Sequence, residues 1–90
     1  MRKIALSTRF TKKLKKLTPE KFNMVSLAME KFQKGEDETL RIHKLKGTFK
    51  NFWSFDADYD LRVIYSVNKN GNIIIHILNN LGTHSELYGK

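Results

Sequence analysis

The spacing of apolar residues changes once along this 90-residue chain, and that change limits the folds that are open to it. Over residues 10–32 apolar side chains recur every three or four positions, whereas residues 61–67 alternate between apolar and other side chains. A period of 3.6 predicts amphipathic helices, and a period of two predicts strands with one buried face. Helices that precede a run of strands indicate an α+β fold.

The helical part of the pattern carries its own start and stop signals. Residues 3–7 alternate and predict a short strand, after which Ser7 or Thr8 can cap a helix. The run Thr18–Glu20 predicts a second helix, because threonine caps, proline suits the first helical position and glutamate suits the first turn. Gly35 is expected to end it. The apolar positions of the two helices are Phe10, Leu14 and Leu17, and then Phe22, Val25, Ala28, Met29 and Phe32.

The second half predicts a strand meander. Residues 36–48 are expected to form a polar connection, and residues 49–56 and 61–67 to form strands. Asn70–Gly71 predicts a hairpin turn with two positive φ angles, and residues 72–78 are apolar on both faces, as in a central or helix-covered strand. The predicted order is β-α-α-β-β-β, with both helices on one face of an antiparallel sheet and the other face open.

Charge is distributed unevenly within the net charge of +8. Residues 1–34 carry ten Lys and Arg against two acidic residues, whereas residues 35–90 carry seven of each sign. Segregated positive charge predicts a polyanionic partner, either nucleic acid or an acidic protein. A length of 90 residues predicts one domain over residues 1–90. The absence of cysteine suits the reducing cytoplasm, and the absence of a long apolar run predicts no membrane span.

Three histidines can titrate near neutral pH and so act as acid or base. His76 lies in an apolar strand, where a packed ring with one hydrogen bond is expected, while His43 and His84 are expected in loops or at strand edges. Their separations of 33 and 8 residues, without a helical pair or a cysteine, predict no metal site and no cofactor. The acidic run Asp56–Asp60 lacks the glycine and distal glutamate of a calcium loop, which favours a solvated turn.

Arg62 interrupts a predicted strand and is expected to project from the face opposite Leu61 and Val63. A guanidinium on a rigid strand suits bidentate phosphate binding, and it suits an ion pair with a nearby acid such as Asp60 equally well. The aromatic pair Trp53 and Phe55 is open to two interpretations as well, core packing or stacking on a base.

Several runs together resemble one protein family. His43–Gly47, Asn51–Ser54 and Leu61–Tyr65 are similar to the middle of RelE/ParE-superfamily toxins, and Gly82–Gly89 resembles the YafQ-like branch. The resemblance covers essentially the whole chain and implies a RelE-like fold, with two N-terminal helices packed on a twisted antiparallel sheet.

The resemblance implies a toxin of a type II toxin-antitoxin system, with a cognate antitoxin as partner. Its implied activity is ribosome-dependent, metal-independent cleavage of messenger RNA by attack of a 2′-OH on the adjacent phosphate. His43 would be the base, His84 the acid, Arg62 the phosphate stabiliser and Tyr88 an orienting residue. The residues expected to contact RNA are Lys12, Lys13, Lys16, Lys44, Lys46, Lys50 and Asp60.

The chain departs from the YafQ-like pattern at two positions. Asn80 replaces a usual arginine, for which Arg62, Lys46 or Lys50 can substitute, and Asp56 replaces a usual histidine. Two alternatives to the nuclease therefore stay open: a ParE-like inhibitor of DNA gyrase, and a catalytically weak homologue that binds RNA or antitoxin.

Overall fold

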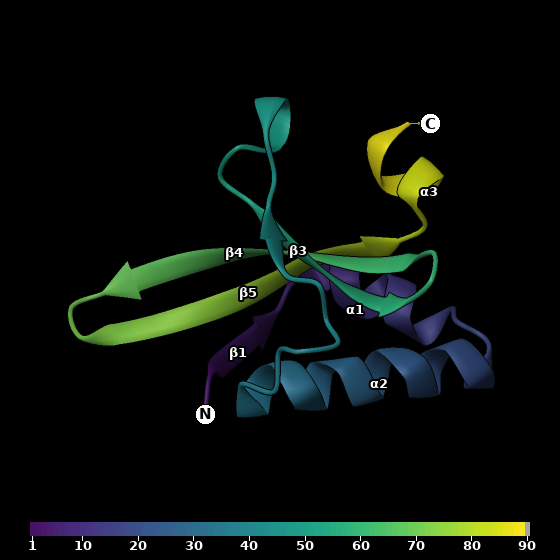
Figure 1. Ribbon diagram of the computed structural model, residues 1–90, viewed down its shortest axis with the longest axis horizontal. Helices are drawn as coiled ribbons and strands as arrows, with labels where there is room; N and C mark the ends of the chain where they lie inside the picture. Colours follow the sequence, from purple (N-terminus) through teal and green to yellow (C-terminus); the bar gives the residue numbers. More distant parts are fainter. Residues whose placement is uncertain (90) are drawn as a thin grey trace.

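A five-stranded sheet with two long helices on one side organises the chain, which a computed structural model describes over residues 1–89 (Figure 1). In order, the elements are β1 (Lys3–Leu6), α1 (Thr8–Lys15), α2 (Pro19–Lys34), β2 (His43–Lys44), the 3-10 helix η1 (Gly47–Phe49), β3 (Trp53–Asp58), β4 (Leu61–Asn70), β5 (Ile73–Gly82) and α3 (His84–Tyr88). The predicted α+β architecture is confirmed.

Both long helices begin at the predicted caps and α2 ends at the predicted Gly35, whereas α1 ends at Lys15, before the expected helical position Leu17. The Ser7 side chain accepts a hydrogen bond from the N–H of Phe10 at 3.0 Å, and Thr18 caps α2 in the same way. Gly35 ends α2 with φ at 78°, a left-handed conformation that glycine adopts without steric cost. Within residues 1–89, the helices are too short or too polar to cross a membrane.

The sheet has the order β1-β5-β4-β3-β2 and is mixed. β5 lies between β1 and β4, as its apolar faces predicted. β1, however, runs parallel to β5, with Ile4 opposite His76, so the prediction of a purely antiparallel sheet is wrong at this edge. The reason is topological: the α1–α2 hairpin and three further strands separate β1 from its partner, and local sequence does not specify such a pairing.

Three local predictions need correction. The predicted polar connection contains the short edge strand β2, and His84, expected in a loop or at a strand edge, is the first residue of α3. The hairpin between β4 and β5 exists, but its two central residues are Gly71 and Asn72, because Asn70 still pairs with Ile73. Among residues 1–89 positive φ occurs at Gly71 and not at Asn70, so this turn needs one left-handed residue instead of two.

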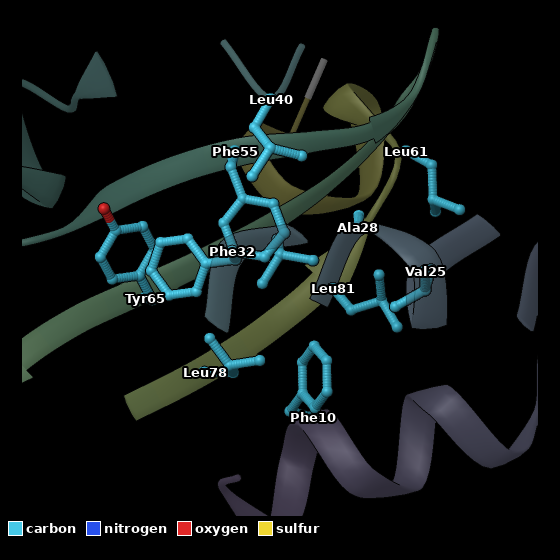
Figure 2. Packing of buried hydrophobic residues seen from close by; sticks show 11 residues of the cluster. Phe10, Val25, Ala28, Phe32, Leu40, Phe55, Leu61, Tyr65, Leu78 and Leu81 are labelled. Atoms are coloured by element: carbon cyan, nitrogen blue, oxygen red, sulfur yellow. The ribbon is translucent and has the colours of Figure 1, made fainter. Parts of the chain in front are cut away.

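The core fills the space between the helices and the sheet (Figure 2). Phe32 of α2 is fully buried and stacks on Phe55 of β3, with ring centroids 4.6 Å apart. Trp53 packs against the same cluster, so both aromatic residues of β3 belong to the core side, as the core-packing interpretation has it. Burial of this cluster fixes which face of each strand remains for a site.

The second face of the sheet is less open than predicted. η1 and α3 lie on the side of the sheet opposite α1 and α2 (Figure 1). Ile64 of β4 is only 3% exposed, and the aromatic rings of Phe49 and Tyr88 meet edge to face at 5.4 Å. η1 and α3 thus form two walls over a polar face of the sheet, and the candidate site lies there.

Candidate active site

Four side chains that the sequence singled out lie around one pocket of about 410 Å³. His43 comes from β2, Arg62 from β4, and His84 and Tyr88 from α3. Lys46, the residue that caps η1, lines the same pocket. Residues far apart in the sequence are therefore brought together on the face of the sheet that the long helices leave uncovered.

The His43 imidazole is oriented by two hydrogen-bond partners. Its Nδ1 lies 3.0 Å from the carbonyl oxygen of Arg41, and its Nε2 lies 3.3 Å from Oγ of the buried Ser54. A carbonyl oxygen can only accept, so Nδ1 carries the proton in the neutral ring. Nε2 is then the unprotonated nitrogen, and it accepts from the Ser54 hydroxyl. Nε2 is thus the atom of His43 that can take up a proton.

Arg41 holds its carbonyl toward His43 through an uncommon backbone conformation. Its φ is 53°, in the left-handed region that non-glycine residues rarely adopt. Such a conformation costs on the order of 1 kcal/mol or more, and the surrounding structure must enforce it. The backbone before β2 is thus set in the geometry that orients the His43 ring.

Arg62 lies between two carboxylates. Its Nε is 3.5 Å from Oδ1 of Asp56, and its Nη1 is 3.3 Å from Oδ1 of Asp60. The predicted ion pair with Asp60 is thus present, and the side chain also faces the pocket. Asp56 Oδ1 is buried and has no hydrogen-bond partner in residues 1–89, so the two arginines near Asp56, Arg62 and Arg41, compensate its charge.

α3 is short, and side-chain hydrogen bonds define its start. Thr83 and Glu86 form a reciprocal capping box, and the backbone N–H of Thr83 lowers the pKa of the Glu86 carboxyl by donating a hydrogen bond to it. Asp60 accepts a hydrogen bond from the backbone N–H of His84 at 3.1 Å. The His84 ring lies 4.8 Å from the Tyr88 ring, so both side chains extend from one face of this turn.

A second pocket of about 580 Å³ adjoins the first, because Arg62 and His84 line both. Three carboxylates and two arginines surround this larger pocket, whereas the smaller one has Lys46 and Arg62 and no carboxylate. A phosphate is attracted to positive potential. The smaller pocket is therefore the electrostatically suitable place for a phosphodiester, despite its size.

The other lysines predicted to bind RNA lie elsewhere. Lys44 pairs with Trp53 in the sheet, and its Nζ lies 5.8 Å from the centre of that ring on the core side, away from His43. Lys13 of α1 and Lys16, the residue after α1, line a different pocket, and Lys12 is exposed on α1. Lys50, just after η1, is exposed and does not line the His43 pocket.

Two contributors to the site were missed in the sequence. Ser54 is fully buried and positions the His43 ring. The sequence contained a signal for it, because a residue between Trp53 and Phe55 on one strand points to the face opposite the core. Arg41 gave no such signal, because a left-handed arginine follows from tertiary structure.

His76 packs as expected, edge-on to Phe32 at 5.5 Å and with Nδ1 3.4 Å from the Lys3 carbonyl.

This arrangement of two helices, a sheet with β1 parallel to β5, and a polar face beside a short C-terminal helix is the fold of RelE/ParE-type toxins. The family described as the bacterial toxin of type II toxin-antitoxin systems, YafQ, matches residues 2–89. The chain therefore belongs to the YafQ toxin family. No curated protein matches it in sequence.

Solved structures agree in fold. YafQ from E. coli strain BL21(DE3) is 19% identical with a TM-score of 0.78, covering 99% of this chain and 100% of that one. A copper-bound mutant toxin from Helicobacter pylori is 30% identical with a TM-score of 0.65, covering 98% and 100%. The E. coli DinJ–YafQ toxin-antitoxin complex contains a chain 20% identical with a TM-score of 0.73, covering 98% of both.

Proposed function

We propose that this toxin is an endoribonuclease that cleaves messenger RNA at the ribosome without a metal ion. The observation that carries the proposal is that His43, Arg62, His84 and Tyr88 line one pocket. Cleavage by a 2′-OH needs a base for its proton, an acid for the leaving oxygen and positive charge at the phosphate. These side chains have the chemistry for each of the three tasks.

In the proposed step, the ribose 2′-OH replaces the Ser54 hydroxyl as hydrogen-bond donor to Nε2 of His43. The 2′-oxygen then attacks the adjacent phosphorus while Nε2 takes up the hydroxyl proton. The bond from phosphorus to the 5′-oxygen breaks, and the imidazolium of His84 donates a proton to that oxygen. The products are a 2′,3′-cyclic phosphate and a 5′-OH end. No oxidant or further reactant is needed.

Arg62 is proposed to stabilise the extra negative charge on the phosphorane. Its Nε and Nη1 face Asp56 and Asp60, and the side chain also lines the pocket together with Lys46. Both cations are proposed to contact phosphate oxygens there. Tyr88, beside the His84 ring, is proposed to orient the leaving nucleotide.

Copper in the Helicobacter pylori relative raises the question of a metal in this chain. Within residues 1–89, no three His, Cys, Asp or Glu side chains gather in a way that would hold a metal ion. The residues therefore do not fit a resident metal, and the proposed step uses side chains alone.

We also propose a cognate antitoxin as partner, as YafQ has DinJ in the E. coli complex. The excess positive charge of residues 1–34 suits an acidic or amphipathic antitoxin segment that covers the basic helices and the polar sheet face.

Two observations favour the second candidate, a weakly active homologue that binds RNA or antitoxin. Asp56 neutralises part of the Arg62 charge, and Asn80 replaces the arginine usual in YafQ-like toxins. The loss of one charge-stabilising donor typically lowers a rate by about 10²–10³. Under this alternative, the protein would cleave RNA slowly.

The test is to sequence RNA 5′ ends after brief induction, alongside reactions on purified ribosomes that contain a chelator selective for transition metals, which leaves in place the Mg²⁺ that ribosomes need. The wild type is expected to leave 5′-OH ends in messenger RNA, unaffected by the chelator. His84→Ala should reduce cleavage by about 10²–10⁴, because the leaving oxygen loses its acid. Arg62→Ala should reduce it by about 10²–10³.

His76→Gln is the matched control, since it removes a histidine that lies outside the pocket. It should cleave like the wild type. Wild-type cleavage by both His84→Ala and Arg62→Ala would refute the assigned site. DNA damage signalling without any RNA cleavage would identify the gyrase-inhibitor alternative, and normal growth under strong induction would identify an inactive homologue.

A further inference from the structure

A β-bulge in β5 sets two consecutive asparagines on the same face of the sheet. Tyr65 pairs with Leu78 and Ile64 pairs with Asn80, so Asn79 is the extra residue of the bulge. Successive strand residues normally point to opposite faces, and a bulge changes the direction of side chains locally. Both asparagines therefore line one pocket.

That pocket has apolar walls and a volume of about 320 Å³. Phe49, Phe52 and Ile64 form the walls, and Arg9 of α1 lies at the rim. The ring centroids of Phe49 and Phe52 are 6.5 Å apart, and the two ring planes are inclined at 68°. Phe49 also lines the His43 pocket, so the two cavities are neighbours. A cavity with aromatic walls and a cation thus adjoins the proposed cleavage site.

Hydrogen bonds within the sheet fix the orientation of both amides. Asn79 donates its two amide hydrogens to Ser66 Oγ and to the Ile77 carbonyl, at 2.9 Å each, which leaves its oxygen as an acceptor. Asn80 accepts from the N–H of Leu81 at 2.9 Å, which leaves its amino group as a donor. Neither remaining group has another hydrogen bond within residues 1–89. The pocket therefore offers one acceptor and one donor on adjacent residues.

We infer that this cavity, the base pocket (Phe49, Phe52, Ile64, Asn79 and Asn80), binds an unstacked RNA base next to the scissile phosphate; the inference rests on the proposed function. Proteins read single-stranded RNA by stacking splayed bases on aromatic rings and by hydrogen bonding to their edges. The Watson–Crick edge of a base places a donor beside an acceptor, which matches the two amides. Arg9 is in position to meet the phosphate of that nucleotide.

Asn80→Asp tests the inference with almost no change in shape. The variant keeps an oxygen for the N–H of Leu81 and loses the amino donor. In a map of RNA 5′ ends, the wild type should prefer certain bases at one position at a fixed distance from the cut. Asn80→Asp should change that preference and slow cleavage by about tenfold. Phe52→Leu, which removes a stacking ring, should slow cleavage by about tenfold whatever the base.

Asn68→Asp is the matched control, because it makes the same chemical change at an exposed residue of β4. It should keep the wild-type map and rate. If Asn80→Asp and Phe52→Leu also keep both while the wild type cleaves, the base pocket is refuted and the nuclease stands. A wild type that cleaves no RNA refutes the nuclease itself. If both variants weaken only the complex with purified antitoxin, the pocket belongs to the antitoxin and the inference is overturned.

Discussion

His76 lies outside the site, and its surroundings change the pKa of its side chain. Its ring is partly buried beside Phe32, and this burial lowers the pKa of the imidazole, as does the charge of Arg2. The hydrogen bond from the ring to the Lys3 carbonyl acts in the opposite direction and is the smaller influence on the pKa beside burial. His76 is thus a structural residue that connects core packing to pH.

A lowered pKa predicts that acid destabilises the fold through His76. The unfolded chain binds the proton first as the pH falls, so this contribution to stability is complete above the unfolded pKa of about 6.5 and is lost as the pH falls through the folded value. Urea unfolding between pH 7.5 and 5 should show a larger loss of unfolding free energy for the wild type than for His76→Gln. Equal losses in the two proteins would contradict the assignment.

At the scale of elements, α3 depends on few interactions. It spans five residues, and its position rests on the capping box, the buried Leu87 and the hydrogen bond from its first N–H to Asp60. A side chain at Gly82 would lie 2.9 Å from Glu86 Oε1, so the strand must approach the cap closely. Since α3 carries both His84 and Tyr88, its stability sets how well the pocket is formed.

Thr83→Ala should therefore affect the site before it affects the sheet. Loss of the cap is expected to cost about 1 kcal/mol and to increase opening of α3. Hydrogen exchange should become faster over residues 84–88 and stay unchanged over β4 and β5, while RNA cleavage falls severalfold. Thr83→Ser keeps the hydroxyl and should behave like the wild type. Faster exchange throughout the sheet would show instead that α3 is part of the global folding unit.

At the scale of the whole molecule, the local signals in the sequence were sufficient for the starts of the two long helices, for the end of α2 and for the existence of the β4–β5 hairpin. Ser7, Thr18 and Gly35 act through neighbours a few residues away, so their effects can be predicted without coordinates. The parallel pairing of β1 with β5 and the left-handed Arg41 depend on contacts across most of the chain, and no local pattern encodes them. The roles expected for His43 and His84 came from the family resemblance and not from periodicity. That the two side chains line one pocket is visible only in the structure.

Lys12, Lys13 and Lys16 do not line the pocket that holds His43, so charge and chemistry can be separated experimentally. If these three lysines contact RNA, replacing all of them with glutamine should weaken ribosome binding and make it less dependent on salt. Each phosphate contact contributes about 0.7–0.9 to the slope of log K against log salt, so the slope should fall by about two to three. Binding is measured in a His84→Ala background, where the message stays largely intact.

The same three substitutions in an otherwise wild-type chain should leave cleavage positions unaltered, because the pocket residues are unchanged. This separates long-range attraction from recognition: the helices would raise the local concentration of the toxin at RNA, and the polar face would select the phosphodiester. An unchanged salt slope, together with weaker binding of purified antitoxin, would assign the basic helices to the antitoxin alone. The positive charge of residues 1–34 would then serve neutralisation of the toxin and not its attack on RNA.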